Sequence, residues 1–157
     1  MNAFKKTGGF TLVELIIVIA ILAILSSVAV VGYSSYITKA NNSAVESFLN
    51  DISTAATLAN AKVGQITQIT VVELTAADNK GAKGDLKVTI TGNLDEKDFK
   101  ADFEAAVNEK VAGTLTAGEN GAADTYVVYF AAPSAWAGSK YTAPTWSAAA
   151  GWSKPAA

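Results

Sequence analysis

The sequence predicts an α+β protein, in which a long N-terminal α-helix packs on a C-terminal antiparallel β-sheet domain that carries an additional helix. Three observations support this prediction. Leu15 to Val31 is an apolar run whose only polar residues are two serines. Apolar residues then recur every three or four positions as far as Val63, which is the period of a helix. At residues 86–91 apolar and polar residues alternate, which is typical of a half-buried strand.

The first part of the predicted helix is long enough to cross a membrane. Residues 10–31 are apolar apart from Thr11, Glu14 and the two serines, and a bilayer core needs about 20 helical residues. Lys5 and Lys6 precede this run. Because positive residues tend to stay on the cytoplasmic side, we expect a short inner N-terminus and the bulk of the chain outside.

A secretory signal peptide is the competing interpretation of the apolar run. It fits less well, because the run is longer than the apolar region of a usual signal peptide. In addition, no small-residue cleavage site introduces a hydrophilic mature start after it. The positive segment instead ends in Gly8-Gly9, before the apolar run. We therefore expect a membrane-spanning helix that stays with the protein.

Beyond Val31 the predicted helix continues with one apolar face. No proline or glycine interrupts Tyr33 to Lys62, which argues against a signal anchor joined by a linker to an unrelated soluble domain. A helix over Thr11–Val63 would be about 80 Å long at 1.5 Å per residue. Its apolar stripe needs a partner, which the rest of the chain can supply. The stripe consists of Ile37, Ala40, Ala44, Phe48, Ile52, Ala55, Ala59 and Val63.

The distal part of the chain combines strands with one further helix. Residues 66–74 fit a strand; alternatively, Thr70 and Glu73 form a capping box for a short helix that ends near Asn79. Residues 86–91 are a predicted strand, 118–124 a loop, 126–131 a strand, and 141–147 one or two further strands.

The additional helix is predicted between these strands. It begins at Asn93 or Asp95, has an acidic first turn, and ends at Gly113. Its inward stripe consists of Phe99, Phe103, Val107 and Val111.

Composition excludes several classes of protein. The chain has no cysteine and no histidine, and all 12 of its basic residues are lysine. Disulfides, thiol nucleophiles, imidazole bases and Cys/His metal cages are therefore excluded. A net charge of −2 without a basic cluster argues against nucleic-acid binding. We expect no enzymatic activity, no cofactor and no metal site.

Several local patterns have a plainer interpretation than a binding site. The carboxylates of residues 95–109 alternate with lysines at helical spacing, which is typical of a solvated face. Residues 78–85 lack the alternating ligands of a calcium loop, so a turn is expected. Asn41-Asn42-Ser43 is a glycosylation-type triplet on the long helix. The three tryptophans are expected to be packing anchors rather than an adhesive surface patch.

The start of the chain resembles the type IV pilin family. The resemblance lies in the basic leader ending in Gly8-Gly9, the phenylalanine after it, and Glu14 four residues further on. In that family a prepilin peptidase cuts after the glycine, here Gly9, and methylates the new amine, here on Phe10. Two tyrosines further along also fall where type IVa pilins commonly carry them, here Tyr33 and Tyr36.

The resemblance at the N-terminus, together with the hydrophobic periodicity of the rest of the chain, predicts a pilin-like fold and a division of the chain into four segments. Residues 1–9 are the leader peptide removed by the peptidase, and 10–32 the hydrophobic transmembrane and assembly helix. Residues 33–63 are the amphipathic half of the same helix, and 64–157 the globular α/β head.

The chain departs from the family within the apolar segment. Ala23 and Val31 stand where many pilins carry glycine and proline. Only Gly32 weakens the helix here, and glycine lacks proline's kinking clash. We therefore expect a straighter helix than in those pilins.

Glu14 is the one residue of this apolar run with an ionisable side chain. An ionisable side chain inside a membrane helix costs about 3 kcal/mol on insertion scales, so it normally has a partner. Cleavage after Gly9 would create an amine on Phe10, within one helical turn of Glu14. In a monomer the two groups can pair internally. In a filament the resemblance implies that Glu14 neutralises the Phe10 amine of a neighbouring subunit, which fixes the axial step between subunits.

The alternative for Glu14 is a position at the lipid headgroups with no role in assembly. On the docking hypothesis the assembly contacts come from this carboxylate, the new N-terminus and the apolar side chains that follow. The predicted assembly residues are Phe10, Glu14, Leu15, Ile16, Ile19 and Leu22.

The function predicted from these features is that of a structural subunit which polymerises through its N-terminal helix into a type IV pilus. The expected partners are further copies of the chain, prepilin peptidase, the membrane-bound assembly machinery, and membrane lipid before assembly. The chain has no ATP-binding loop, so energy for extraction must come from that machinery. The expected locations are the cytoplasmic membrane first and the extracellular pilus afterwards. The alternatives are a pseudopilin of a type II secretion or competence system, and a membrane-anchored extracytoplasmic enzyme or binding domain.

Overall fold

A computed structural model describes residues 8–60, 65–77, 81–94, 96–110, 115–120 and 124–155. The chain divides into two compact parts, residues 1–37 and 38–157, and each is described here by itself. Helix α1, Leu12–Ala59, contributes to both parts.

Helix α1 follows the predicted helix closely within the described residues. It begins one residue after Thr11, which caps it, and Gly32 does not interrupt it. The predicted end at Val63 lies outside the described residues, and Asn60 is already in a turn. A helix straighter than in pilins that carry glycine and proline in this segment stays a prediction.

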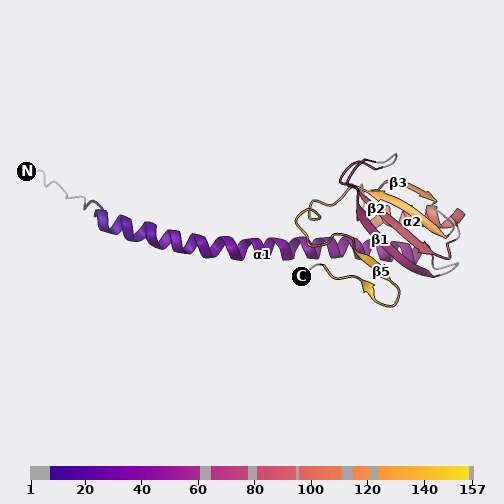
Figure 1. The fold of residues 1–157 in the computed structure, drawn as a ribbon, viewed down its shortest axis with the longest axis horizontal. Helices are drawn as coiled ribbons and strands as arrows, with labels where there is room; N and C mark the ends of the chain where they lie inside the picture. The colour runs from indigo at the N-terminus through magenta and orange to yellow at the C-terminus, as the bar shows by residue number, and fades with distance from the viewer. Residues whose placement is uncertain are drawn as a thin grey trace, which may run out of the picture. The chain divides into compact units, whose positions relative to one another are not determined.

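The second part is built on one antiparallel sheet of six strands in the order β3-β4-β2-β1-β5-β6. Figure 1 shows β1 and β2 side by side with β5 on the far side of β1. The strands are β1 (Ile66–Glu73), β2 (Leu86–Gly92), β3 (Leu115–Asn120), β4 (Thr125–Phe130), β5 (Thr145–Ser147) and β6 (Gly151–Trp152). This sheet, with the long helix and a second one, confirms the predicted α+β class.

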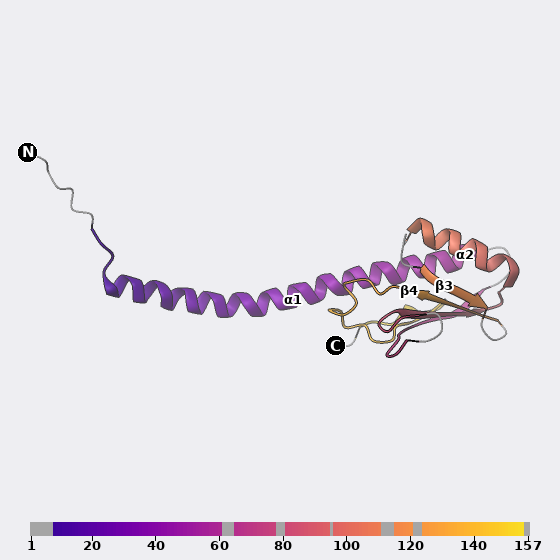
Figure 2. The same ribbon diagram turned by 90° about the horizontal axis from the view of Figure 1, so that it is seen from above.

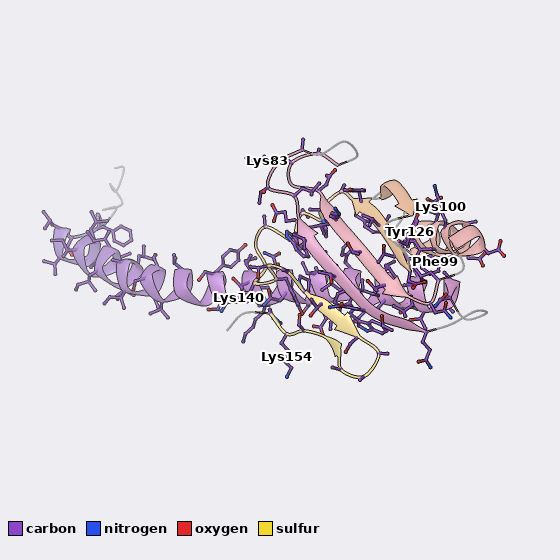
Figure 3. All side chains as sticks on the ribbon, turned by 45° about the vertical axis from the view of Figure 1, so that its right-hand side comes forward. Lys83, Phe99, Lys100, Tyr126, Lys140 and Lys154 are labelled. Carbon is purple, nitrogen blue, oxygen red and sulfur yellow. The ribbon has the colours of Figure 1, made fainter. Side chains whose placement is uncertain are left out.

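The second half of α1 and helix α2, Glu96–Lys110, lie on the same side of the sheet (Figure 2). Phe48 of α1 meets Phe130 of β4 edge to face, with ring centroids 5.8 Å apart. Phe99 and Phe103 of α2 both pack against Tyr126 of β4, and Figure 3 shows Phe99 and Tyr126 next to each other. The core therefore lies between the two helices and this face of the sheet.

The predicted stripe of α1 is only partly correct. Phe48, Ile52, Ala55 and Ala59 are buried as expected, whereas three members nearer the N-terminus are exposed: Ile37, Ala40 and Ala44. The buried set instead begins at Val45, and it also includes Leu49 and Ala56. The reason is geometric: a helix has 3.6 residues per turn, so a stripe drawn in steps of four drifts away from the face that meets the sheet.

The structure distinguishes between the strand and the helix that the sequence allowed at residues 66–74. Residues 66–73 form a strand rather than a capped helix: Ile69 and Val71 are buried, and the backbone pairs with β2 on one side and with β5 on the other. The strand at 86–91 and the helix with buried Phe99 and Phe103 are confirmed. Val111 and Gly113 lie outside the described residues.

The loop predicted at 118–124 is wrong in its first three residues. Residues 118–120 belong to β3, which pairs with β4 through Gly118↔Val128 and Asn120↔Tyr126. Glycine and asparagine are poor strand formers, but here the backbone ladder with β4 outweighs their local preference. Residues 121–123 lie outside the described part.

The C-terminal segment, residues 131–155, is tied to α1 and β1 by side-chain hydrogen bonds. The Trp152 indole N–H donates to Ser53 Oγ at 3.2 Å, and the Trp136 indole N–H donates to Glu73 Oε2 at 3.0 Å. The Lys140 N–H donates to Asn42 Oδ1 at 2.8 Å. Trp136 is buried, and Trp146 and Trp152 are half-buried against the core. The tryptophans are packing anchors, as predicted.

Candidate assembly site

The first turn of α1 is closed by a reciprocal pair of side chains. Glu14 Oε2 accepts hydrogen bonds from the Thr11 backbone N–H at 2.9 Å and from the Thr11 hydroxyl at 2.8 Å. In return, Thr11 Oγ1 accepts the Glu14 backbone N–H at 3.3 Å. This is a capping box, in which each side chain satisfies a backbone donor that the helix start leaves free.

The geometry leaves one oxygen of the Glu14 carboxylate uncommitted. Both bonds from Thr11 go to Oε2, and no hydrogen bond to Oε1 is seen among the described residues. The carboxylate is thus held by its own helix while its second oxygen can accept a further donor.

Thr11 is the residue that the sequence reasoning missed at this site. The pattern that identifies it is Thr-Leu-Val-Glu, in which the threonine precedes the helix and the glutamate stands three residues later. Without a known helix start, Thr11 is only a polar interruption of the apolar run.

The other predicted assembly residues lie on the surface of the first part of the chain. Gly9 and Phe10 precede the helix, and the Phe10 side chain is 89% exposed. Apolar side chains surround the helix on all sides, which a protein in water alone would not favour. The exposed set includes Leu15, Ile16, Ile19 and Leu22.

Two serines add the only other polar groups of the apolar helix. Ser26 Oγ donates to the Leu22 carbonyl and Ser27 Oγ to the Ile24 carbonyl, each at 2.7 Å. Their hydroxyls are therefore satisfied within the helix and need no water.

This helix has the length and composition of a membrane span. An 18-residue window of Leu12–Ala59 has a mean hydropathy of 3.0, and none of that window is buried within the protein. Among the described residues, no other helix is long and apolar enough to cross a membrane.

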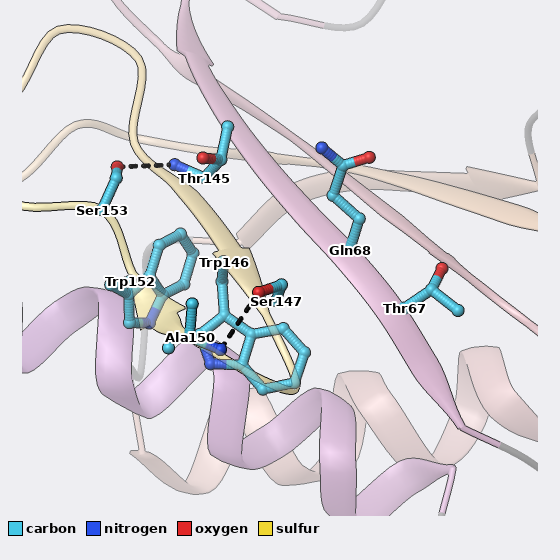
Figure 4. Close-up of a pocket in the computed structure, with 9 residues that line it drawn as sticks. Thr67, Gln68, Thr145, Trp146, Ser147, Ala150, Trp152 and Ser153 are labelled. Atoms are coloured by element: carbon cyan, nitrogen blue, oxygen red, sulfur yellow. Dashed lines mark hydrogen bonds between the residues drawn. The ribbon is translucent and has the colours of Figure 1, made fainter.

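A separate surface depression of about 360 Å³ lies over β1, β5 and β6. Figure 4 shows Trp146, Trp152 and Ser147 around it, with Gln68 and Thr67 on the neighbouring strand. No charged side chain lines it. Among the described residues there is also no group of three or more acidic, cysteine or histidine side chains that could hold a metal ion.

The comparisons with known proteins concern the N-terminal segment, which includes the first turn of α1. The family model for the prokaryotic N-terminal methylation motif matches residues 4–30. No curated protein and no solved structure matches the chain.

The matched motif and the apolar helix together define a type IV pilin-like prepilin N-terminus. The motif supports a type IV pilin-like or pseudopilin-like protein, and it points to a structural protein of this type. It implies processing by prepilin peptidase and assembly into a type IV pilus-like system. The apolar helix and the motif also fit anchoring in a membrane before assembly.

Proposed function

We propose that the chain is the structural subunit of a type IV pilus on the cell surface. It is synthesised with the leader 1–9, held in the cytoplasmic membrane by residues 10–32, cut after Gly9 and methylated on Phe10. Residues 33–63 support the head, residues 64–157, which remains outside the membrane. The membrane-bound assembly machinery then supplies the energy to extract the subunit, and the pilus is extracellular.

The capping box at the start of α1 is the observation that carries this proposal. Glu14 Oε2 is held by Thr11 in the subunit itself, so Oε1 is the oxygen that receives the Phe10 amine of the next subunit. A buried carboxylate left without a cation is strongly unfavourable, whereas a hydrogen-bonded pair offsets most of the desolvation. Docking is therefore favourable only at the axial step that brings amine and carboxylate together.

The apolar side chains around this pair provide the area of contact. In the membrane, Leu15, Ile16, Ile19 and Leu22 contact lipid tails; in the filament they pack against neighbouring helices. Packing of aliphatic side chains is largely non-directional, so the position of each subunit along the filament is set by the charged pair.

Two measurements test the proposal directly. Mass spectrometry of surface filaments is expected to find a chain that begins with N-methyl-Phe10. Glu14→Gln is expected to lower the number of filaments per cell by at least about tenfold, since an effect above 1.4 kcal/mol per contact corresponds to that factor. Glu46→Gln, which changes an exposed acid further along α1, is the matched control and is expected to leave filaments unchanged.

The outcomes separate the alternatives. Normal filament numbers with Glu14→Gln would contradict the role of the carboxylate. Short stubs in place of long filaments, labelled by an antibody to the head, would support a pseudopilin. Release of residues 10–157 as an active monomer would support an anchored enzyme or binding domain.

A further inference from the structure

The edge of strand β1 that faces β5 is paired over only part of its length. β5 pairs with β1 at Gln68–Thr70. One residue further on, the Val71 N–H donates to the Pro144 carbonyl at 3.0 Å. Pro144 has no N–H to give in return, so it ends the ladder and leaves the Val71 carbonyl without a bond from this strand.

Strand geometry shows which groups come next along this edge. In an antiparallel ladder, the backbone groups of alternate residues point to the same neighbour. The Leu74 N–H bonds the Asp85 carbonyl at 2.8 Å on the β2 side, so Glu73 points to the β5 side, as Val71 does. In the part of the chain that the structure describes, no backbone group pairs with Glu73 on that side. Because Pro144 itself lies opposite Val71, the edge is open beyond it, at Glu73.

A cavity of about 510 Å³ lies against this open edge. Sites for small ligands and short segments typically measure roughly 300–1,000 Å³. One side of the cavity is formed by Val72, Glu73 and Thr75 at the end of β1, and the other by residues of the C-terminal segment. The latter are Trp136, Ala137, Ser139, Tyr141 and Thr142.

The walls of this cavity are preformed. Trp136 and Tyr141 are 4% and 7% exposed, so both are fixed by packing, and the Trp136 indole is bonded to Glu73 Oε2. The Val72 side chain, by contrast, is 44% exposed and offers apolar contact. A preformed site loses little conformational entropy when a ligand enters.

The cavity also has a definite charge. Glu73 is the only charged residue among those that line it, and its Oε1 takes no hydrogen bond from the described residues. Burial and the nearby charge of Glu46 raise the pKa of Tyr141, which places a second carboxylate near this wall. An incoming cationic side chain would thus meet a favourable potential.

We propose that the open edge of β1 binds an extended segment of a partner protein that carries a lysine or arginine side chain. The segment adds a short antiparallel strand beyond Pro144: its backbone bonds the N–H and C=O of Glu73. Its basic side chain reaches Glu73 Oε1, and an apolar neighbour covers Val72. Backbone bonds provide affinity and the side chains provide selectivity, as in other cases of strand addition. This site does not depend on polymerisation of the N-terminal helix.

The test uses the full chain, labelled with ¹⁵N and held in detergent micelles, with synthetic peptides as probes. Acetyl-Thr-Val-Lys-Val-Thr-amide is expected to give saturable shifts of the Val72, Glu73 and Thr75 amides and of the Trp136 indole. The same peptide with glutamate in place of lysine is expected to bind about fivefold more weakly, the size of one partly exposed ion pair. A version with methylated backbone nitrogens is expected not to bind, because it lacks the donors for the edge.

Two variants of the protein complete the test. Glu73→Gln keeps an acceptor for the Trp136 indole, so the fold is retained, but it is expected to abolish the preference for lysine over glutamate. Asp102→Asn, an exposed acid on α2, is expected to preserve that preference. Absence of saturable shifts in a folded protein would overturn the proposal, as would equal binding of the backbone-methylated peptide or of the acidic peptide to the unchanged protein.

Discussion

The Thr11 hydroxyl makes most of the hydrogen bonds that close the first turn of α1. It both donates to Glu14 and accepts from the Glu14 backbone, so two of the three bonds of the capping box depend on it. The third uses the Thr11 backbone and survives any substitution except proline. The hydroxyl therefore controls how firmly the Glu14 carboxylate is oriented.

The first prediction concerns this hydroxyl. Thr11→Val has nearly the same shape but lacks both side-chain bonds, and loss of a helix cap costs about 1 kcal/mol. We expect fewer filaments per cell, with normal removal of the leader, because the carboxylate is less well oriented. Thr11→Ser retains the hydroxyl and is expected to preserve filament numbers. Equal filament numbers for valine and serine would show that orientation by Thr11 is unimportant.

Tyr126 gives the head a dependence on alkaline pH. Burial raises the pKa of its phenol well above the ordinary value of 10.0. The charge of Glu104, which accepts the phenol hydrogen bond at 3.1 Å, raises it further. Since the folded state favours the protonated phenol, its full contribution to stability is present below pH 10 and decreases as the pH rises above that value.

The second prediction follows from this sign. Between pH 9 and pH 11 the urea midpoint of the wild-type head, followed by near-ultraviolet circular dichroism, is expected to fall. Tyr126→Phe is expected to be about 1 kcal/mol less stable at pH 8, because it lacks the bond to Glu104, and to fall less steeply with pH. Tyr33→Phe, at an exposed tyrosine, serves as the control. An identical slope for Tyr126→Phe would assign the alkaline transition to other groups.

Among the elements, β2 ends where the chain passes very close to β1. A Cβ atom on Gly92 would lie 2.6 Å from the Gln65 carbonyl oxygen and 2.8 Å from the Ile66 Cα. Both of these are backbone atoms, so neither can rotate away. Glycine is therefore required by this approach of two strands.

The third prediction compares two glycines. Gly92→Ala is expected to destabilise the head by about 1–3 kcal/mol, the usual effect of overpacking, measured as a lower urea midpoint. Gly32→Ala lies in a helix where a Cβ would meet nothing within 4 Å, so it is expected to leave the head unchanged and to strengthen helix α1 slightly. A neutral Gly92→Ala would mean that β1 and β2 can separate at this end.

The C-terminal segment is a second element whose attachment can be measured. Trp152 packs on the core and donates its indole N–H to Ser53 of α1. The two residues are 99 positions apart in the chain, so this contact closes the head over a long distance.

The fourth prediction is a double-mutant cycle on this contact. Ser53→Ala and Trp152→Phe are each expected to lower the unfolding free energy, and their combination to cost about 0.5–1.5 kcal/mol less than the sum. Amide exchange of residues 145–153 is expected to accelerate in both single variants. Simple additivity would show that the two side chains do not interact.

Secondary structure is predicted well from the sequence where the hydrophobic periodicity is strong. It is predicted poorly where a segment becomes a strand only because it pairs with a neighbouring strand. Alternation at Leu86 to Ile90 and the spacing of Phe99 and Phe103 identify β2 and α2 without further information. β3 could not be found in the same way, because Gly118 and Asn120 favour turns and are held in the strand only by β4. The open edge of β1 depends on strand order and on Pro144, and neither is visible before the fold is known.

At the scale of the whole molecule, the sequence alone is enough to propose the residues of the candidate assembly site, and their role in assembly stays a prediction. Glu14 stands out because one carboxylate in an apolar run is unfavourable, and the resemblance to pilins supplies its expected partner. The threonine beside it was missed because a capping box matters only once the first residue of the helix is fixed. The chemistry of the apolar run is thus enough to single out Glu14. The role of Thr11 becomes visible only when the first residue of the helix is known.

The whole head is closed without covalent cross-links. The chain has no cysteine, and its C-terminal segment is held by hydrogen bonds to Asn42, Ser53 and Glu73 together with the packing of three tryptophans.

The fifth prediction is therefore that reducing agents have no effect. Filament numbers and the urea midpoint of the head are expected to be the same with and without dithiothreitol. A shift of the midpoint would point to an effect of the reagent other than disulfide reduction, which an equal concentration of oxidised dithiothreitol would reveal.

The distance between Ser53 and Trp152 also has a consequence for biogenesis. Ribosomes add about 5–20 residues per second, so Ser53 leaves the ribosome several seconds before its tryptophan partner is made. During that interval the apolar face of the second half of α1 has no sheet to cover it. We expect a chaperone or the translocation channel to shield this face. On the proposed membrane anchoring, stalling of translation within the last strands would leave an unfinished chain held at the membrane, where quality-control proteases can degrade it.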